Sequence, residues 1–341
     1  MAVTIMDIAK ASGKSYPTVS RAMNDHPKIS EKTKREIRAV AAKLGYRPSF
    51  AGTALKKGRT STFSIIVPDL ADPYYAKFIS FFKHAAQEKE FDVVVYDYER
   101  RPDLERKYLE RMMSGCCDGA AAFITSFLHT HDLVEDLWNA RIPLAAIGTP
   151  HEFAENAKYD WGSIDTDSSV LKILRHLKRQ GRRRLVCLQE PQPEEIRCLL
   201  SKYLEGLLNR AGLPFSSDSC FILHSRGQNQ AEEGFNAGLS LLKNNPEVDM
   251  IWARNGFQAY GLLLAAHRCG RKVPEDLAVI INDNTWISRY SITPLYCLDQ
   301  HLDELAERTF EVLYGRTTSR EWEEPRRFLI AADAVIFNEH P

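Results

Sequence analysis

Apolar side chains recur at helical spacing in three short stretches of the first 46 residues. Thr4 precedes the first stretch and Asp7 follows three residues later, which is the capping pattern of a helix start. Ser15 can cap a second helix that runs to about Asn24, and a third helix is expected after Ser30. The pattern therefore predicts three short helices.

The second of these helices is expected to bury one face and expose the other. Val19, Ala22 and Met23 fall at helical spacing and point inward. The side chains left facing outward are Tyr16, Pro17, Ser20 and Arg21. Two short helices joined through a Gly-containing turn, the second with small polar and basic side chains exposed at its N-terminal end, are typical of a helix-turn-helix. The alternative is a small helical domain with a solvated basic face.

From Thr62 onward the pattern changes to short apolar runs separated by amphipathic stretches. The runs expected to form buried strands are 63–67, 93–95, 119–124, 144–147, 184–188, 219–223, 249–253 and 277–281. Helices are expected near 73–90, 102–114 and 130–140. This alternation predicts an α/β core of parallel sheets with helices on both faces, and the number of units indicates two lobes.

The charge is divided unevenly between these two parts. The chain holds 45 basic and 45 acidic side chains, but residues 1–60 hold 13 basic and four acidic ones. The head therefore carries a formal charge of +9 and the remainder −9. Such a division predicts a head that meets a polyanion and a body that does not. On the second helix, Tyr16 and Arg21 can reach base edges in a major groove, while Ser15, Ser20 and the helix N-terminus can bind phosphates.

The residues of the head resemble a known family. The runs TIMDIAKASG (4–13) and SYPTVSRAMN (15–24), followed by SEKT (30–33) and LGYRP (44–48), resemble the headpiece of the LacI/GalR family of bacterial repressors. The resemblance implies a homodimer that reads a pseudo-palindromic double-stranded DNA operator. The residues expected to contact DNA are Thr4, Ser15, Tyr16, Pro17, Thr18, Ser20, Arg21, Asn24, Leu55 and Lys56.

The resemblance also implies a domain organisation. A helix-turn-helix domain over 1–46 is followed by a hinge helix or linker over 47–60 and by a two-lobed core like the periplasmic binding proteins. The N-terminal lobe is expected over 61–161 plus 290–321, and the C-terminal lobe over 162–289 plus 322–341.

The hinge segment is too short to be a stable helix alone. Leu55 matches the leucine that the family inserts into the minor groove, a known way of bending DNA. Packing of Leu55 on the body is the alternative. Gly52 replaces the usual alanine and should make the hinge more dependent on DNA.

Polar and aromatic side chains follow several strands of the predicted core, where open α/β sheets bind ligands. Asp69, Tyr74 and Tyr75 follow the first strand. Asp165, Trp252, Asn255 and Asp283 follow later strands. Aromatic faces suit stacking on a sugar or base, and carboxylates suit hydroxyls or amines. The alternative for each is a helix cap or a core residue.

The resemblance adds Arg197 to this set and also shows departures from the family. Tyr203 replaces the usual effector-clasping arginine, and Asn255-Gly256 replaces the usual Asn-Asp pair. A sugar clasped by arginine and paired carboxylates is therefore in doubt. The pocket is expected to take a less hydroxylated or aromatic ligand, or to have lost ligand binding.

Other classes of protein receive no support from the sequence. No G-x-G-x-x-G, P-loop or G-x-S-x-G motif is present, so neither an enzyme nor a cofactor is expected. The seven cysteines form no metal or disulfide pattern, and His129-x-His131 lacks a third ligand. No secretory signal or membrane-spanning run is found, which favours a cytoplasmic protein.

Together these features predict a sequence-specific transcription regulator, most simply a repressor. Its operator affinity is expected to depend on a small-molecule effector, a sugar or related metabolite, bound between two lobes. Control by a protein partner, or no control at all, is the first alternative. A pure ligand-binding module is the second.

Overall fold

The computed structural model describes residues 3–47, 52, 58–125, 127–148, 157–191, 193–222, 229–319, 322 and 324–336. Its contacts divide the chain into a head, Met1–Thr60, and a core, Ser61–Pro341. Leu55 and Lys56 of the predicted hinge lie outside the described residues.

The head consists of the three predicted helices, α1 (Ile5–Ser12), α2 (Tyr16–Met23) and α3 (Glu31–Lys43). Each begins at the predicted cap, because the hydroxyls of Thr4, Ser15 and Ser30 each accept a backbone N–H of the first turn. The three helices share one small core, formed by Ile8, Val19, Ala22, Ile37 and Ala41. The predicted caps and inward positions of the head are confirmed.

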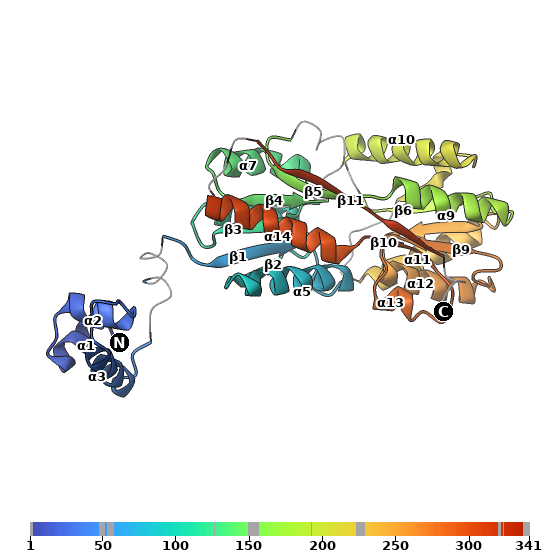
Figure 1. The fold of residues 1–341 in the computed structure, drawn as a ribbon. Helices are drawn as coiled ribbons and strands as arrows, with labels where there is room; N and C mark the ends of the chain where they lie inside the picture. The colour runs from blue at the N-terminus through green and yellow to red at the C-terminus, as the bar shows by residue number, and fades with distance from the viewer. Residues whose placement is uncertain are drawn as a thin grey trace. The chain divides into compact units, whose positions relative to one another are not determined.

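The core contains two six-stranded sheets with helices on both faces (Figure 1). The first sheet has the order β11-β5-β4-β3-β1-β2 and is parallel throughout. Its strands are β1 (Thr62–Val67), β2 (Asp92–Asp97), β3 (Gly119–Phe123), β4 (Leu144–Ile147), β5 (Asp160–Asp165) and β11 (Arg327–Ala331). The helices that pack on it are α5 (Pro73–Glu88), α6 (Pro102–Met112), α7 (Phe127–Asn139) and α14 (Leu302–Ser319). This sheet and its helices form the first lobe.

The second lobe is built around the order β12-β10-β9-β8-β6-β7. Its strands are β6 (Leu185–Gln189), β7 (Cys220–Ile222), β8 (Met250–Ala253), β9 (Ala278–Ile281), β10 (Tyr296–Asp299) and β12 (Asp333–Ile336). Its helices are α9 (Asp167–Arg179), α10 (Glu194–Ala211), α11 (Gln230–Asn244), α12 (Gly256–Arg268) and α13 (Trp286–Arg289), with the 3-10 turn η1 (Ser217–Ser219). The predicted parallel sheets with helices on both faces are confirmed, and the exception is the edge strand β12, which pairs with β10 in the antiparallel direction.

The pairing of strands places the lobe boundaries elsewhere than expected. The predicted boundary at 161/162 falls inside β5, so the chain leaves the first lobe only at Thr166. The predicted boundary at 289/290 precedes β10, which belongs to the second sheet, so the return crossing lies at Gln300. The segment 322–331 was assigned to the second lobe, yet β11 pairs with β5 and the last crossing is Ala332. The predicted boundaries came from the family resemblance, whereas membership of a sheet depends on hydrogen bonds to strands far away in the sequence.

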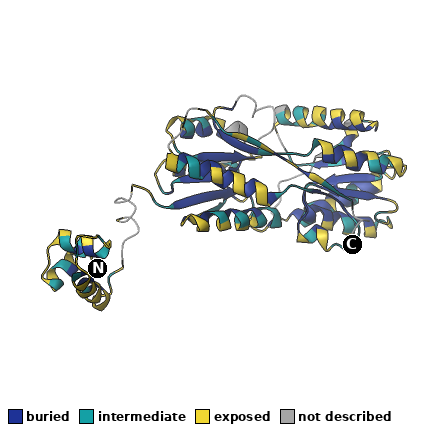
Figure 2. Ribbon diagram, viewed as in Figure 1, coloured by how far each residue is buried: buried dark blue, intermediate teal, exposed yellow. Residues whose placement is uncertain are grey.

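Each lobe has its own interior (Figure 2). Two hydrophobic clusters lie on the two faces of the first sheet, and two others lie on the faces of the second. One strand differs from expectation: β2 is half exposed, because it forms the edge of its sheet. Among the described residues, no helix is long and apolar enough to cross a membrane.

Candidate functional sites

Helix α2 exposes three of the ten predicted DNA-contacting side chains, two in its first turn and Arg21 in its last turn. Val19 and Ala22 are fully buried and fix the rotation of the helix. Tyr16 is 53% exposed, and Pro17 and Arg21 are also exposed. This surface therefore combines a phenol, a guanidinium and the free end of a helix, groups that can bind base edges and phosphates.

Other predicted DNA contacts in the head are partly engaged in local structure. The Thr4 hydroxyl donates to Asp7 Oδ2 at 2.7 Å. The Ser15 and Thr18 hydroxyls share a hydrogen bond of 2.9 Å. Ser20 is half-buried, and Asn24 donates its amide to the Ser20 carbonyl oxygen. These residues shape the ends of α1 and α2, in addition to any contact with DNA.

The acidic side chains of the head are used inside it. Asp25 pairs with Lys34 Nζ at 3.0 Å and with Arg38 Nη2 at 2.9 Å, and these hydrogen bonds, led by that from Lys34, hold the pKa of Asp25 below its usual value. Glu31 also pairs with Lys34, at 2.7 Å. Arg21 on α2 therefore faces solvent while these acids neutralise other cations, which favours contact with a polyanion.

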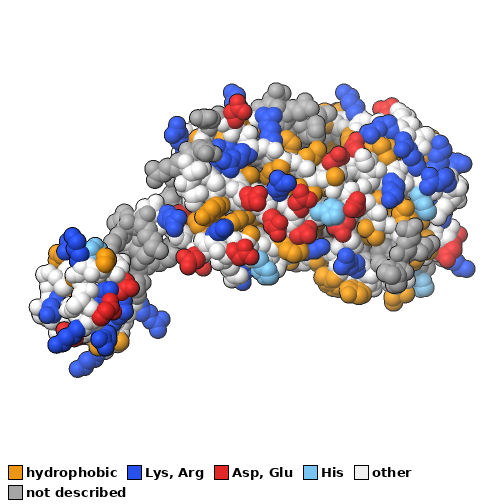
Figure 3. Space-filling model, viewed as in Figure 1, with side chains coloured by type: hydrophobic (Ala, Val, Ile, Leu, Met, Phe, Trp, Pro, Cys, Tyr) orange, Lys and Arg blue, Asp and Glu red, His pale blue; other side chains and the backbone are white. Residues whose placement is uncertain are grey.

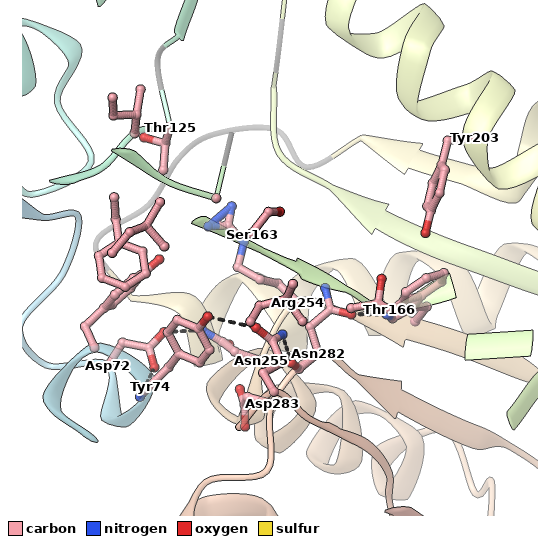
Figure 4. Close-up of a pocket in the computed structure, with 18 residues that line it drawn as sticks. Asp72, Tyr74, Thr125, Ser163, Thr166, Tyr203, Arg254, Asn255, Asn282 and Asp283 are labelled. Carbon is pink, nitrogen blue, oxygen red and sulfur yellow. Dashed lines mark hydrogen bonds between the residues drawn. The ribbon is translucent and has the colours of Figure 1, made fainter. Parts of the chain in front are cut away.

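A cavity of about 400 Å³ lies between the two lobes (Figure 4). Its apolar and aromatic walls are formed by Tyr74, Tyr75, Phe123, Ile124, Ile147, Ile164 and Trp252. Its polar lining is formed by Asp72, Thr125, Ser163, Thr166, Tyr203, Arg254, Asn255, Asn282, Asp283 and Gln300. A cavity of this size and mixed lining is suited to a small molecule.

Six of the nine predicted effector-binding residues line this cavity, namely Tyr74, Tyr75, Tyr203, Trp252, Asn255 and Asp283. Three others do not. Asp69 accepts a hydrogen bond from Gln230 Nε2 at 3.0 Å. Asp165 accepts from the backbone N–H of Asp167 at 3.0 Å, so it holds the start of α9. Arg197 lies on α10 and is not a lining residue.

Seven polar lining residues were not among the predicted site residues, namely Asp72, Thr125, Ser163, Thr166, Arg254, Asn282 and Gln300. Arg254 and Asn282 directly precede predicted positions, and Asp72 lies two residues before Tyr74, so a wider window at each strand end would have included them. Gln300 follows β10, a strand that the apolar pattern did not reveal.

Hydrogen bonds fix the orientation of the aromatic rings. The Tyr74 hydroxyl donates to Gln300 Oε1 at 2.8 Å, and Trp252 Nε1 donates to Asn282 Oδ1 at 2.7 Å. Gln300 in turn donates to the Asn282 carbonyl oxygen. Because these polar groups bond to one another, the rings of Tyr74 and Trp252 are held in place to contact a ligand.

Two buried carboxyl groups face one another from the two lobes. Asp72 accepts from the Tyr74 N–H at 3.0 Å and from Asn255 Nδ2 at 2.7 Å. Asp283 accepts from the backbone N–H of Gly256 at 3.0 Å and from the Thr285 hydroxyl at 3.1 Å. Burial raises the pKa of Asp72, and burial together with the negative charge of Asp72 raises the pKa of Asp283 to about 6.

Tyr203, which stands where the family has an arginine, binds Asp167. The Tyr203 hydroxyl donates to Asp167 Oδ1 at 2.7 Å, beside Arg210, which donates to Asp167 Oδ2 at 2.6 Å. Among the described lining residues, the cationic one is Arg254, which pairs with Glu190. A guanidinium is thus present at the cavity, but it comes from the end of β8 and not from α10.

A helical head with an exposed second helix, joined to a two-lobed α/β core with a cavity between the lobes, defines a class of DNA-binding proteins with a ligand-binding core. Residues 4–49 match the model of bacterial regulatory proteins of the lacI family. Residues 60–333 match the model of periplasmic binding proteins and the sugar binding domain of the LacI family. The chain belongs to the LacI family, and the resemblance drawn from the head is confirmed.

Relatives and solved structures agree with this assignment. The chain is 28% identical to the HTH-type transcriptional regulator DegA of Bacillus subtilis over 312 residues, which cover 90% of each chain. It is 26% identical to the HTH-type transcriptional repressor CytR of Escherichia coli, over 92% of this chain and 89% of that one. The Lac repressor bound to ONPG superimposes with a TM-score of 0.79 at 20% identity, over 98% of both chains, and this shows the shared fold.

Proposed function

We propose that the protein is a sequence-specific transcriptional repressor that acts in the cytoplasm and has no catalytic role. The observation that carries this proposal is the surface of α2, where Tyr16 and Arg21 are exposed while Val19 and Ala22 anchor the helix. Membership of the LacI family and the similarity to transcriptional regulators support it.

A selection experiment tests this proposal. The full chain would be used to enrich a random duplex library, and the enriched duplex would be compared with a shuffled one by fluorescence anisotropy at about 150 mM salt. We expect the enriched duplex to bind about 10³-fold more tightly or better. Arg21→Gln should reduce this preference by about tenfold or more, corresponding to about 1–3 kcal/mol for a base contact.

Arg179→Gln is the matched control, because Arg179 is an exposed arginine of the core. It should leave the preference unchanged. Equal affinity for enriched and shuffled duplexes would refute the proposal.

The cavity between the lobes is the proposed site of a small-molecule effector that controls operator affinity. Its volume and its fixed aromatic rings support this role. A panel of sugars and nucleosides should contain a ligand that raises the melting temperature, because binding to the folded state stabilises it. Tyr75→Ala should abolish the shift and Arg179→Gln should preserve it. A shift that survives Tyr75→Ala would place the ligand elsewhere.

The second lobe carries an exposed apolar surface that we assign to a second copy of the chain. It includes Tyr260, Trp286, Tyr290 and Ile292, of which Tyr290 is 82% exposed. These residues line a groove of about 550 Å³. Hydrophobic side chains gather at the lower edge of the core, where Figure 1 places α13 (Figure 3). A contiguous surface of this kind marks an interaction site, and a two-fold dimer matches a pseudo-palindromic operator.

Sedimentation velocity tests the dimer. Tyr290→Asp should shift the protein to monomers at micromolar concentration, because a charge would be placed in the apolar contact. Met113→Glu is the control, since Met113 is an exposed apolar residue of the first lobe. An unchanged dimer in Tyr290→Asp would place the interface on another surface.

A further inference from the structure

A cluster of charged side chains joins the two lobes beside the cavity. Arg100, which follows β2 in the first lobe, donates from Nη1 to Glu190 Oε1 of the second lobe at 2.6 Å. Both side chains are 8% exposed. Glu190 also pairs with Arg254, which lines the cavity. One buried carboxylate is therefore shared by a guanidinium from each lobe.

Two amide contacts accompany this ion pair. Gln230 Nε2 donates to Asp69 Oδ2 at 3.0 Å, and Asn255 Nδ2 donates to Asp72 Oδ2 at 2.7 Å. Each joins the end of β1 to the second lobe. We call these contacts, together with Arg100–Glu190, the interlobe latch.

The position of the latch in the two sheets determines what it restrains. The chain crosses between lobes beside β5 and β11 of the first sheet and beside β10 and β12 of the second. The latch residues instead follow β1, β2, β6 and β8 or begin α11, toward the opposite edges of the two sheets. Rotation of the lobes about the crossings would open the cleft at the latch.

The lobes do not share a hydrophobic interior that would hold them closed. No hydrophobic cluster of the described residues contains side chains from both lobes. Opening at the latch would therefore expose little apolar surface, and polar contacts decide the position of the cleft. Arg100 Nε also lies 3.7 Å from Asp69 Oδ2 of its own lobe, so the guanidinium keeps a charged neighbour when it separates from Glu190.

We propose that the interlobe latch, centred on Arg100–Glu190, holds the cleft closed in the unliganded protein and must release before a ligand can enter or leave the cavity. Because Arg254 lines the cavity and shares Glu190 with Arg100, a ligand that engages Arg254 acts directly on the latch. Any effect of latch release on operator affinity rests on the proposed function. The existence of the latch does not depend on it.

Hydrogen exchange of the unliganded full chain tests the latch without DNA. The informative backbone amides are those of Tyr74, held by Asp72, and Gln258, held by Asn255, because Asp72 and Asn255 meet across the cleft. Glu190→Gln removes the shared charge and keeps the shape of the side chain. We expect the peptides over 70–76 and 255–260 to exchange at least tenfold faster, equivalent to about 1.4 kcal/mol.

Two comparisons separate a latch from general destabilisation. Arg106→Gln removes an ion pair within the first lobe and should leave both peptides unchanged. Arg100→Gln should accelerate exchange as Glu190→Gln does, and the double variant should add little, because both changes remove the same contact. If Glu190→Gln accelerates exchange throughout the core, the test rests on Arg100→Gln. That variant must then show the tenfold acceleration in the peptides over 70–76 and 255–260.

Exchange in both peptides that stays within twofold of the wild type would overturn the latch. Effects of the two substitutions that simply multiply in the double variant would also overturn it. Neither result would bear on the affinity of the head for DNA, so failure of the latch and failure of the proposed function are distinguishable.

Discussion

Arg316 and Asp160 form a fully buried ion pair, and removing one partner should strongly destabilise the first lobe. Nε and Nη2 of Arg316, on α14, donate to the two carboxylate oxygens of Asp160, at the start of β5, at 2.8 and 2.7 Å. Both side chains are 1% exposed. The guanidinium also lies 4.9 Å from the ring centroid of Trp138 and 5.5 Å from that of Trp322. The backbone N–H of Arg326, just before β11, donates to Asp160 at 2.7 Å.

Arg316→Met keeps much of the apolar stem but leaves Asp160 buried with its charge uncompensated. A hydrogen bond to a charged group contributes about 1.5–3 kcal/mol, and breaking a buried ion pair from one side costs about 3–5 kcal/mol. We therefore expect the free energy of unfolding of the core to fall by about 4 kcal/mol and its melting temperature by roughly 10 °C.

Urea unfolding followed by circular dichroism provides the measurement. Asp160→Asn/Arg316→Met should be less destabilised than the sum of the single variants, because the pair is lost only once. Arg106→Met is the control, since its ion pairs with Glu110 and Asp132 are exposed, and it should leave unfolding unchanged within error. A loss below about 1 kcal/mol for Arg316→Met, or strict additivity in the double variant, would refute the reasoning that the buried charge needs its partner.

Three further predictions concern the head and the cavity. Ile8→Ala should lower the free energy of unfolding of the head by about 2–4 kcal/mol, because Ile8 is fully buried. Calorimetry should show the unfolding transition of the core unchanged. A shift in the transitions of both head and core would contradict their division into independent units. Ser15→Ala should destabilise α2 by about 1 kcal/mol, because the Ser15 hydroxyl caps the helix by accepting the Thr18 N–H. The loss would appear as faster hydrogen exchange of the Thr18 amide. Unchanged exchange would mean that water replaces the cap. The folded-state pKa of Asp283 is about 6, raised from 3.8, so the stability that this group contributes is present below pH 3.8 and is lost as the pH rises to about 6. Urea unfolding from pH 4 to 7 should show the wild type losing about 2 kcal/mol relative to Asp283→Asn, and a constant difference would show that Asp283 titrates normally.

The head could be predicted almost completely because its signals are local. The caps at Thr4, Ser15 and Ser30 and the inward positions Val19 and Ala22 are read from neighbours within four residues, and the structure confirms them. A helix start depends on backbone N–H groups of its own first turn, so the sequence around it contains the needed information.

The cavity could be predicted only in part. The rule that ligands bind at strand ends selected Tyr74, Trp252 and Asp283, and all three line the cavity. It also selected Asp165, which instead holds the start of α9. Gln300 was missed because its strand, β10, carries too short an apolar run to be recognised. At a strand end, capping a helix and lining a cavity use the same residue types, and only the position of the other lobe separates the two roles.

The sequence by itself determined the three helices of the head, the separation of a basic head from an acidic body, the alternating α/β core and the family. These features depend on side-chain periodicity, on charge counts and on short motifs, all of which are properties of the chain. Only the tertiary structure decided that β11 returns to the first sheet, that Arg254 replaces the expected arginine at the cavity, and that Glu190 is shared by arginines of both lobes. Those pairings join residues as many as 166 positions apart, as between β5 and β11, because the hydrogen bonds and charges that create them act through space and leave no local pattern in the sequence.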